Sequence, residues 1–140
     1  MSGHNFEFIR RVRYSDVTVG DHVFYSRYLE FIEEARGEFF RHIGLPLSDL
    51  TKQNLQMPVV DLQVKYRAPA QYDDELTISV QLTSLTRLRM TFQYRIINQS
   101  ARQLVKATIL HACTGDSGRP RRMPAELHDL LAAALATRIQ

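Results

Sequence analysis

The pattern of apolar residues changes its period near residue 57, and this change restricts the chain to a mixed fold of helix and sheet. Between Tyr25 and Gly44, apolar residues recur at the three- and four-residue intervals of an amphipathic helix. Gly44 and Pro46 end that pattern. Four later segments alternate apolar and polar residues instead, which is typical of strands with one buried face. The sequence therefore predicts an α+β fold, with one long helix on the concave face of a five-stranded antiparallel sheet.

Two further elements lie near the ends of the chain. Residues Phe6 to Tyr14 alternate partially and precede the turn-forming pair Ser15-Asp16, so we expect the first strand there. Pro124 starts an apolar pattern that predicts a short last helix. The expected order is a strand, the long helix, four strands in a meander and the last helix. The four strands are expected within residues 57–69, 75–82, 89–96 and 104–114.

The outer face of the long helix carries charged residues, as solvated helix faces do. Gly37 lies opposite the middle of the apolar stripe. A glycine inside a helix costs about 1 kcal/mol relative to alanine, which is easier to understand where another backbone packs close by. The pattern favours a helix that is covered on more than one side, followed by a polar connection over Ser48–Gln56.

Length and composition indicate one folded domain over residues 1–140. Hydrophobic residues make up 44% and charged residues 24%, which excludes disordered and fibrous classes. No apolar run approaches the roughly 18 residues of a membrane span, and the first residues lack the apolar core of a signal peptide. We therefore expect a cytoplasmic protein. Cys113 is the single cysteine and has no CxxC neighbour, so we expect no disulfide and no metal site.

The net charge of +3 comes from dispersed arginines and favours an anionic partner only weakly. A solvated surface, a phosphate-bearing small ligand and nucleic acid are all compatible with it. No RNP-like pattern, zinc-finger spacing or helix-turn-helix signature supports nucleic acid, so we expect none. The small arginine clusters are Arg10, Arg11 and Arg13, and Arg119, Arg121 and Arg122.

The segment from Asp16 to Phe31 brings acids, a histidine and aromatic rings to the start of the long helix. A loop that enters a helix presents unpaired N–H groups and the positive end of the helix dipole. Such a place can polarise a carbonyl group, and a carboxylate or histidine beside it completes the parts for hydrolysing an ester-like bond.

The stretch VRYSDVTVGDHVFYSRYLEFIEEARGEFFRHIGLP resembles the N-terminal signature of hotdog-fold acyl-CoA thioesterases, in the family typified by hydroxybenzoyl-CoA thioesterase. The resemblance continues through VVDLQVKYRAPAQYDDELTISVQL, with the family's Tyr-x-x-Pro-Ala turn and Asp-Asp-x-Leu strand start, and reaches HACTGDSGRPRRMP. It implies a hotdog fold whose sheet wraps the long helix, and homodimers or homotetramers with sites between subunits. It also implies hydrolysis of an acyl-CoA or acyl-carrier thioester without a cofactor, with the N–H of Tyr25 directed at the thioester carbonyl.

One position departs from the family pattern. The family's loop carries two acids with one residue between them, and the second is the nucleophile or general base. This chain reads Asp16-Val17-Thr18, so the resemblance places Thr18 where that carboxylate is expected. A threonine hydroxyl without an adjacent base is a poor substitute at neutral pH.

Four explanations remain open. Asp21 and His22 can supply a base from the same loop, because the ordinary pKa of histidine suits proton transfer. Arg36, which matches a helix arginine of some relatives, can act with water. A helix glutamate, Glu33 or Glu34, can face the site. Alternatively, the chain has lost the activity and only binds an acyl thioester.

Each candidate also has an ordinary structural role. Asp16 is suited to capping a turn, and Arg36 to pairing with Glu33. Packing in the interior is the alternative for His22, Tyr25, Tyr28 and His111.

The resemblance assigns the phosphates of coenzyme A to the hairpin that carries Arg87 and Arg89. The Arg119–Arg122 cluster offers a second basic patch, and a solubilising surface explains both sets as well. Acyl-CoA thioesterase activity is thus the expected function, with non-catalytic thioester binding as the alternative. A hydratase would need a histidine and an aspartate on a differently organised loop.

Overall fold

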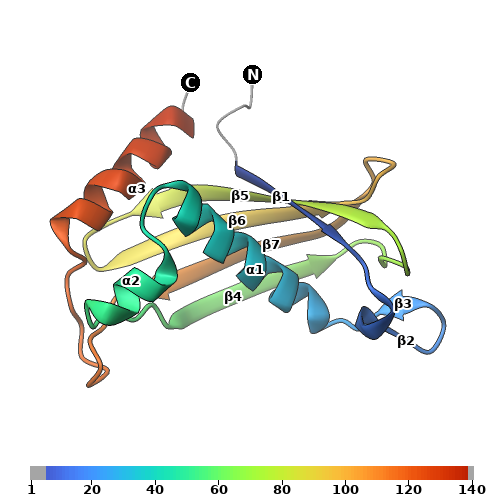
Figure 1. The fold of residues 1–140 in the computed structure, drawn as a ribbon, viewed down its shortest axis with the longest axis horizontal. Helices are drawn as coiled ribbons and strands as arrows, with labels where there is room; N and C mark the ends of the chain where they lie inside the picture. Colours follow the sequence, from blue (N-terminus) through green and yellow to red (C-terminus); the bar gives the residue numbers. More distant parts are fainter. Residues whose placement is uncertain (1–5, 139–140) are drawn as a thin grey trace.

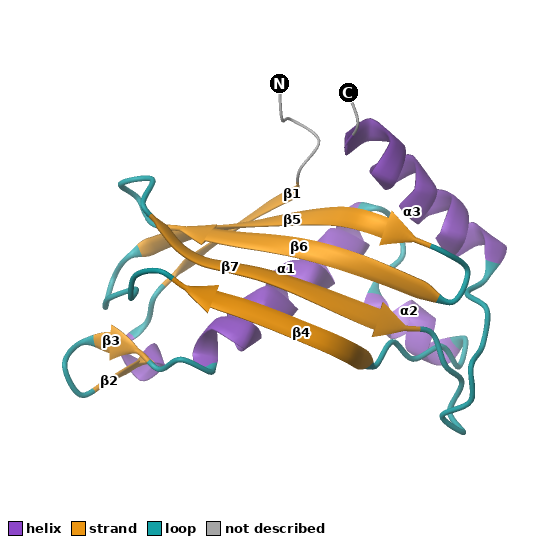
Figure 2. Cartoon of the chain, turned by 180° about the vertical axis from the view of Figure 1, so that it is seen from behind, coloured by secondary structure: helices purple, strands orange, loops and turns teal. Residues whose placement is uncertain are grey.

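The structure is a computed structural model that describes residues 6–138 (Figure 1). A long helix, α1 (Arg27–His42), lies across one face of a five-stranded sheet, and the opposite face is not crossed by any described element (Figure 2). The five strands of this sheet are β1 (Phe6–Arg11), β4 (Val59–Tyr66), β5 (Glu75–Leu85), β6 (Arg89–Ile97) and β7 (Gln103–Ala112). The remaining elements are a 3-10 turn (Tyr14–Asp16), β2 (Val17–Thr18), β3 (His22–Val23), α2 (Leu47–Lys52) and α3 (Ala125–Arg138).

All neighbouring strands are antiparallel, in the order β1-β5-β6-β7-β4. The predicted four-strand meander is therefore wrong at β4, which pairs with β7 rather than with β5. The connection between β4 and β5 explains this difference because it crosses the end of the sheet. It leaves β4 where Arg67 N–H donates to Leu104 O, and it reaches β1 where Asp73 N–H donates to Val12 O.

The alternating residues of the sheet and the helical stripe of α1 form one hydrophobic core between the sheet and the helix. In β5, Leu76, Ile78, Val80 and Leu82 are buried against α1, as the sequence predicts. The apolar stripe of α1 faces them and includes Tyr28, Phe31, Ile32, Ala35 and Phe39. Burial of these side chains provides most of the driving force for placing the helix on the sheet.

Three boundaries differ from the sequence predictions. β1 ends at Arg11, because Tyr14–Asp16 form a 3-10 turn. The long helix begins at Arg27 rather than at Tyr25. The connection predicted as polar over Ser48–Gln56 contains the short helix α2. Periodicity cannot reveal this helix, because it has only six residues.

Gly37 is covered by a side chain and not by a backbone. A Cβ atom at Gly37 would lie 3.8 Å from Leu47 Cδ1, which is ordinary van der Waals contact, and no backbone atom of the described residues outside α1 is as close. The expected second cover of the helix is thus present on α2, but its predicted cause, a closely packed backbone, is wrong within one chain.

The last helix, α3, forms as predicted and packs against β5 through the buried side chains of Leu127 and Leu131. Within the described residues, no helix combines the length and the apolar character needed to cross a membrane.

Candidate active site

The loop before α1 is a small hairpin that places Thr18 opposite His22. β2 and β3 pair antiparallel, with Val17 facing Val23 and Thr18 facing His22. Gly20 and Asp21 form the turn with positive φ angles of 89° and 60°. Facing residues of such a pair have Cβ atoms about 5 Å apart, so the structure brings these two candidates together.

Asp21 is directed away from His22. Its Oδ1 atom accepts a hydrogen bond from Tyr72 N–H at 3.1 Å, which ties the hairpin to the turn before β5. Among the described residues, no ion pair joins His22 to a carboxylate. The structure therefore gives Asp21 a role in holding the hairpin, and His22 stands without an acidic partner within one chain.

The N–H groups of Tyr25 and Ser26, just before α1, have no hydrogen-bond partner in the described part of the chain. Arg27 N–H donates to Phe24 O at 2.9 Å, and Leu29 N–H donates to Ser26 O at 3.2 Å. In the described part of the chain, neither Tyr25 N–H nor Ser26 N–H donates a hydrogen bond. The positive end of the helix dipole adds to these donors, so this place suits a developing negative charge on oxygen.

The ring of Tyr25 is not a core aromatic, since 64% of the residue is exposed, whereas Tyr28 is buried as the structural interpretation expects. A cavity of about 370 Å³ lies between the hairpin, the helix start and the end of β4. Its wall includes His22, Tyr25, Tyr28, Tyr66 and Arg67. His22 and Tyr25, whose N–H group is free, thus line one cavity.

Thr18 lines a different hollow. It contributes to a cavity of about 410 Å³ together with Tyr14, Val17, Val19 and Asp21. Within one chain, Thr18 and His22 therefore face separate spaces although they are cross-strand neighbours.

Asp16 is a buried ion-pair residue, with only 4% of its surface exposed. Its Oδ2 atom lies 2.6 Å from Arg10 Nη1 and accepts a hydrogen bond from Arg13 N–H at 2.8 Å. Arg27 Nε lies 3.7 Å from Oδ1. Burial alone would raise the pKa of Asp16, but these hydrogen bonds and positive charges outweigh it and hold the pKa below its usual value. This geometry agrees with the turn-capping interpretation of Asp16.

Arg10 links three elements around this carboxylate. Besides Asp16, its guanidinium donates to Glu34 Oε1 at 2.9 Å and lies 4.3 Å above the ring of Phe31. The network ties β1 and the turn before β2 to the middle of α1. Sequence reasoning counted Arg10 only as part of a charge cluster, because nothing local in the sequence shows which distant acids it meets.

Arg36 points into the core rather than toward the helix start. Only 8% of it is exposed, and its Nη2 atom donates to Glu33 Oε1 at 2.8 Å, as the structural interpretation expects. Its Nη1 atom lies 3.4 Å from Nε2 of the buried His111. Arg36 lies nine positions after Arg27, which places it about 14 Å further along the helix axis. The side chain of Arg36 therefore does not reach the cavity at the helix start.

His111 has the structural position that the sequence predicts. Its Nδ1 atom lies 3.0 Å from Met57 O, an acceptor, so Nδ1 carries the proton and Nε2 accepts from Arg36. Burial lowers the pKa of His111, and the charge of Arg36 lowers it further. The nearby hydroxyl of Tyr94 and the Nε atom of Arg36 are buried without a partner among the described residues.

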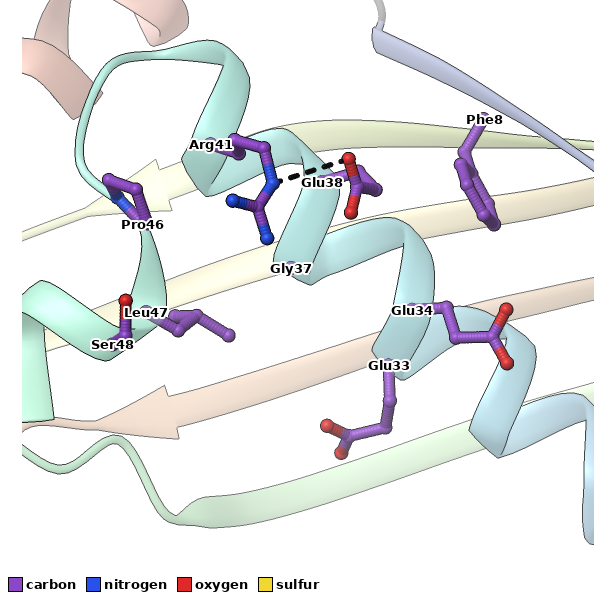
Figure 3. A pocket seen from close by; sticks show the side chains of 9 residues that line it. All are labelled: Phe8, Glu33, Glu34, Gly37, Glu38, Arg41, Pro46, Leu47 and Ser48. Atoms are coloured by element: carbon purple, nitrogen blue, oxygen red, sulfur yellow. Dashed lines mark ion pairs between the residues drawn. The ribbon is translucent and has the colours of Figure 1, made fainter.

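The helix glutamates lie beside a cleft between α1 and α2 (Figure 3). Glu33 and Glu34 leave the helix in different directions, and the cleft of about 360 Å³ also touches Gly37 and the ion-paired Glu38 and Arg41. Neither glutamate lines the cavity at the helix start.

The hairpin with Arg87 and Arg89 lies at the other end of the sheet. Arg87 donates two hydrogen bonds to Met123 O, at 3.0 and 2.7 Å, and so anchors the segment before α3. Arg89 is exposed at the start of β6, whereas the helix start lies near the end of β6 (Figure 1). One chain therefore does not bring these arginines to the candidate site.

Sequence reasoning also missed Tyr66, which lies in the alternating segment over residues 57–69. The hydroxyl of Tyr66 donates to Tyr25 O at 2.8 Å, and Ala70 N–H donates to the hydroxyl of Tyr28 at 2.8 Å. The Tyr-x-x-Pro-Ala turn was the available signal, since it fixes both Tyr66 and Ala70 beside the helix start.

Comparison with known proteins identifies the family. Residues 12–135 match the model of the thioesterase-like superfamily. The acyl-CoA thioester hydrolase YbgC of Escherichia coli O6:H1 is 33% identical over 115 residues, 81% of this chain and 86% of that protein. The acyl-CoA thioesterase YbgC of Haemophilus influenzae is 31% identical over 93% of this chain and 99% of that protein.

Solved structures agree with this match. A hypothetical protein from Aquifex aeolicus superposes with a TM-score of 0.85 at 29% identity, covering 90% of this chain and 98% of that chain. The DHNA-CoA thioesterase of Staphylococcus aureus, at 21% identity, shows the fold with a TM-score of 0.90 over 96% of this chain and 93% of that chain. The predicted hotdog fold is confirmed. The chain therefore belongs to the thioesterase-like superfamily.

Proposed function

We propose that this protein is an acyl-CoA thioesterase that hydrolyses a thioester to a free acid and coenzyme A. The observation that carries the proposal is the pair of free N–H groups at the start of α1, beside a cavity that His22 also lines. The relatives named as acyl-CoA thioester hydrolases support the same activity.

In this mechanism, Tyr25 N–H donates a hydrogen bond to the thioester carbonyl oxygen. His22 takes a proton from a water molecule as the water oxygen forms a bond to the carbonyl carbon. The negative charge on the carbonyl oxygen is stabilised by the helix start. The carbon–sulfur bond then breaks, and the proton held by His22 moves to the sulfur of coenzyme A. Water supplies both the oxygen of the acid and the proton of the thiol.

Thr18, Asp16 and Asp21 act around this centre. Thr18 occupies the position that the resemblance assigns to a carboxylate, but within one chain it lines a separate hollow and carries no charge, so it is not the base of this mechanism. Asp16 holds the turn through Arg10, and Asp21 holds the hairpin through Tyr72 N–H. His22 is left as the base on the wall of the cavity.

We also propose that the working unit is a homodimer, or a tetramer of such dimers, joined along β4. This strand is one of the two edges of the sheet, and it exposes Val59, Val60, Leu62 and Tyr66. An unpaired edge with apolar side chains is suited to pairing with a second chain. Antiparallel pairing of two copies of β4 brings the Arg89 end of one sheet to the helix-start end of the other. Arg87 and Arg89 of one copy then lie on the side where the other copy's substrate carries the phosphates of coenzyme A.

Release of free thiol from short, long and aromatic acyl-CoA esters tests the activity. We expect turnover by the natural protein and a loss of at least tenfold in kcat for His22→Ala. Thr18→Asp, run in parallel, restores the family's carboxylate and is expected to raise kcat. No turnover by the natural protein would contradict the proposed activity.

Non-catalytic binding of an acyl thioester is the second candidate. The observations that favour it are the threonine at position 18 and the absence, among the described residues, of an acidic partner for His22. Its signature is tight binding of an acyl-CoA ester without thiol release, together with activity gained by Thr18→Asp.

A further inference from the structure

One hydrogen bond joins the end of β4 to the peptide that begins α1. The hydroxyl of Tyr66 donates to Tyr25 O at 2.8 Å, across 41 residues of sequence. This bond connects the edge strand of the sheet to the backbone that carries the free N–H donors.

The carbonyl group of Tyr25 has no other hydrogen-bond partner in the described chain. Leu29 N–H donates to Ser26 O, so the first turn of α1 leaves Tyr25 O unused. The preceding carbonyl, Phe24 O, is held by Arg27 N–H. The Phe24–Tyr25 peptide, which carries Tyr25 N–H, is therefore held by Arg27 N–H at the helix start. The Tyr25–Ser26 peptide, which carries Ser26 N–H, is held by Tyr66.

Because the Tyr25–Ser26 peptide is planar, the bond from Tyr66 to Tyr25 O also fixes the direction of Ser26 N–H. In a trans peptide the N–H points opposite to the C=O of the same group. Fixing Tyr25 O toward Tyr66 therefore directs Ser26 N–H to the opposite side, and it limits rotation of the turn that also presents Tyr25 N–H. Without the bond, no hydrogen bond of the described residues holds the Tyr25–Ser26 peptide in its orientation.

The ring of Tyr66 is itself supported. It lies edge-on to the ring of Tyr28, with centroids 5.6 Å apart and an interplanar angle of 65°. The hydroxyl of Tyr28 accepts from Ala70 N–H, and Val23 N–H donates to Ala70 O at 3.0 Å. The same support thus holds β4, α1 and the hairpin that carries His22 in one arrangement. Burial raises the pKa of Tyr66, so its hydroxyl stays a donor throughout the neutral range.

We propose that Tyr66 is a positioning residue whose hydroxyl fixes the direction of Ser26 N–H and restrains the turn that presents Tyr25 N–H to the thioester carbonyl. This inference rests on the proposed thioesterase activity. Because the donors act on the charge that develops in the transition state, the effect belongs in kcat and not in KM.

The test is Tyr66→Phe, which removes only the hydroxyl and keeps the ring beside Tyr28. We expect kcat to fall about tenfold, less than the 10²–10³ that follows loss of a whole oxyanion donor, while KM stays within about twofold. Tyr72→Phe is the matched control, because the hydroxyl of Tyr72 makes no hydrogen bond within the described residues. Its kcat is expected to match that of the natural protein. Thermal unfolding and the size of the assembly are measured for both variants.

A second measurement does not depend on activity. In the natural protein we expect the backbone amide signals of Tyr25 and Ser26 in nuclear magnetic resonance to show the rigid behaviour of a fixed turn. In Tyr66→Phe we expect added motion at these two amides, and none in Tyr72→Phe. If the natural protein releases no thiol but this change is seen, the proposed function fails while Tyr66 still positions the turn. Unchanged kcat or unchanged amide signals in Tyr66→Phe would overturn the positioning role.

Discussion

Two buried ionisable side chains, Asp16 and His111, are kept in different charge states by their surroundings. Asp16 is charged because Arg10 and the N–H of Arg13 surround its Oδ2 atom. His111 is neutral because burial and the charge of Arg36 disfavour a second proton. The pKa of each group differs between the folded and the unfolded chain, so each group makes a contribution to the free energy of unfolding that depends on pH.

Asp16→Asn is expected to destabilise the protein by about 3 kcal/mol, because it removes the buried charge of Asp16 and leaves the guanidinium of Arg10 with only the more exposed Glu34 as a charged partner. Urea denaturation at pH 7 measures this loss. Glu75→Gln is the control, since its ion pair with Arg11 is exposed and its removal should change little. Equal effects of the two substitutions would contradict the assignment of Asp16 as a buried anchor.

His111 gives the protein a second dependence on pH, at higher pH than that of Asp16. Its folded pKa lies below the ordinary value of about 6.5, so the unfolded chain takes up a proton first as the pH falls. Its contribution is fully present above about pH 6.5 and is lost as the pH falls toward the folded pKa. Asp16 acts in the same direction, but only below its ordinary value of 3.8.

Unfolding free energies between pH 7.5 and 5 check this expectation. The natural protein is expected to lose stability toward pH 5, with a slope of at most about 1.4 kcal/mol per pH unit from this group. His111→Phe removes the titration, so its curve should be flatter, although its stability at pH 7 is lower. Parallel curves for the two proteins would show that His111 is not the group responsible.

At the scale of elements, periodicity and turn residues predicted the type of most elements and the neighbouring positions of β5, β6 and β7, but not the place of β4. Alternation in β5 and helical spacing in α1 report which face is buried, so both elements and the core were predictable. The place of β4 beside β7 was not, because it depends on a connection that crosses the sheet. The loop before α1 was also found from the sequence, whereas the inward direction of Arg36 and the bond from Tyr66 to Tyr25 depend on partners far away in sequence.

Gly37, inside α1, and Gly44, just after its end, should respond to alanine with opposite signs. Gly37→Ala adds a methyl group in ordinary contact with Leu47 and removes the flexibility of glycine, so we expect about 0.5–1 kcal/mol of added stability. Gly44 has a φ angle of 97°, and Gly44→Ala is expected to cost about 1 kcal/mol through backbone strain alone.

Thermal unfolding of both variants measures these changes. A loss of stability in Gly37→Ala would show that a neighbour absent from the single chain packs against this position. Where that neighbour belongs to a second chain, the loss would depend on protein concentration.

At the scale of the whole molecule, one chain separates groups that the proposed reaction needs together. The helix start and its cavity lie at one end of the sheet, and Arg87 and Arg89 lie at the other (Figure 1). β4 runs between these ends along an open edge. A twofold partner along β4 reverses the strand direction, so each end of one sheet meets the opposite end of the other.

Leu62→Lys is expected to weaken this dimer at least tenfold. Leu62 is 41% exposed on β4, and antiparallel pairing of two β4 strands places the substitution on both sides of the interface. Lysine on an edge strand opposes pairing because the two charges repel and must be desolvated. Gln63→Lys is the control, since it adds the same charge to the neighbouring residue, whose side chain points to the other face of the sheet.

Sedimentation measures the dissociation constant of both variants, and thiol release is followed over the same range of concentration. In Leu62→Lys we expect activity to fall as the protein dilutes into monomers, because each site then loses the basic end of the other sheet. In Gln63→Lys both quantities should match the natural protein. A dimer that tolerates both lysines would place the interface elsewhere than β4. Full activity in monomers would mean that the arginines at the far end of the sheet take no part in binding coenzyme A.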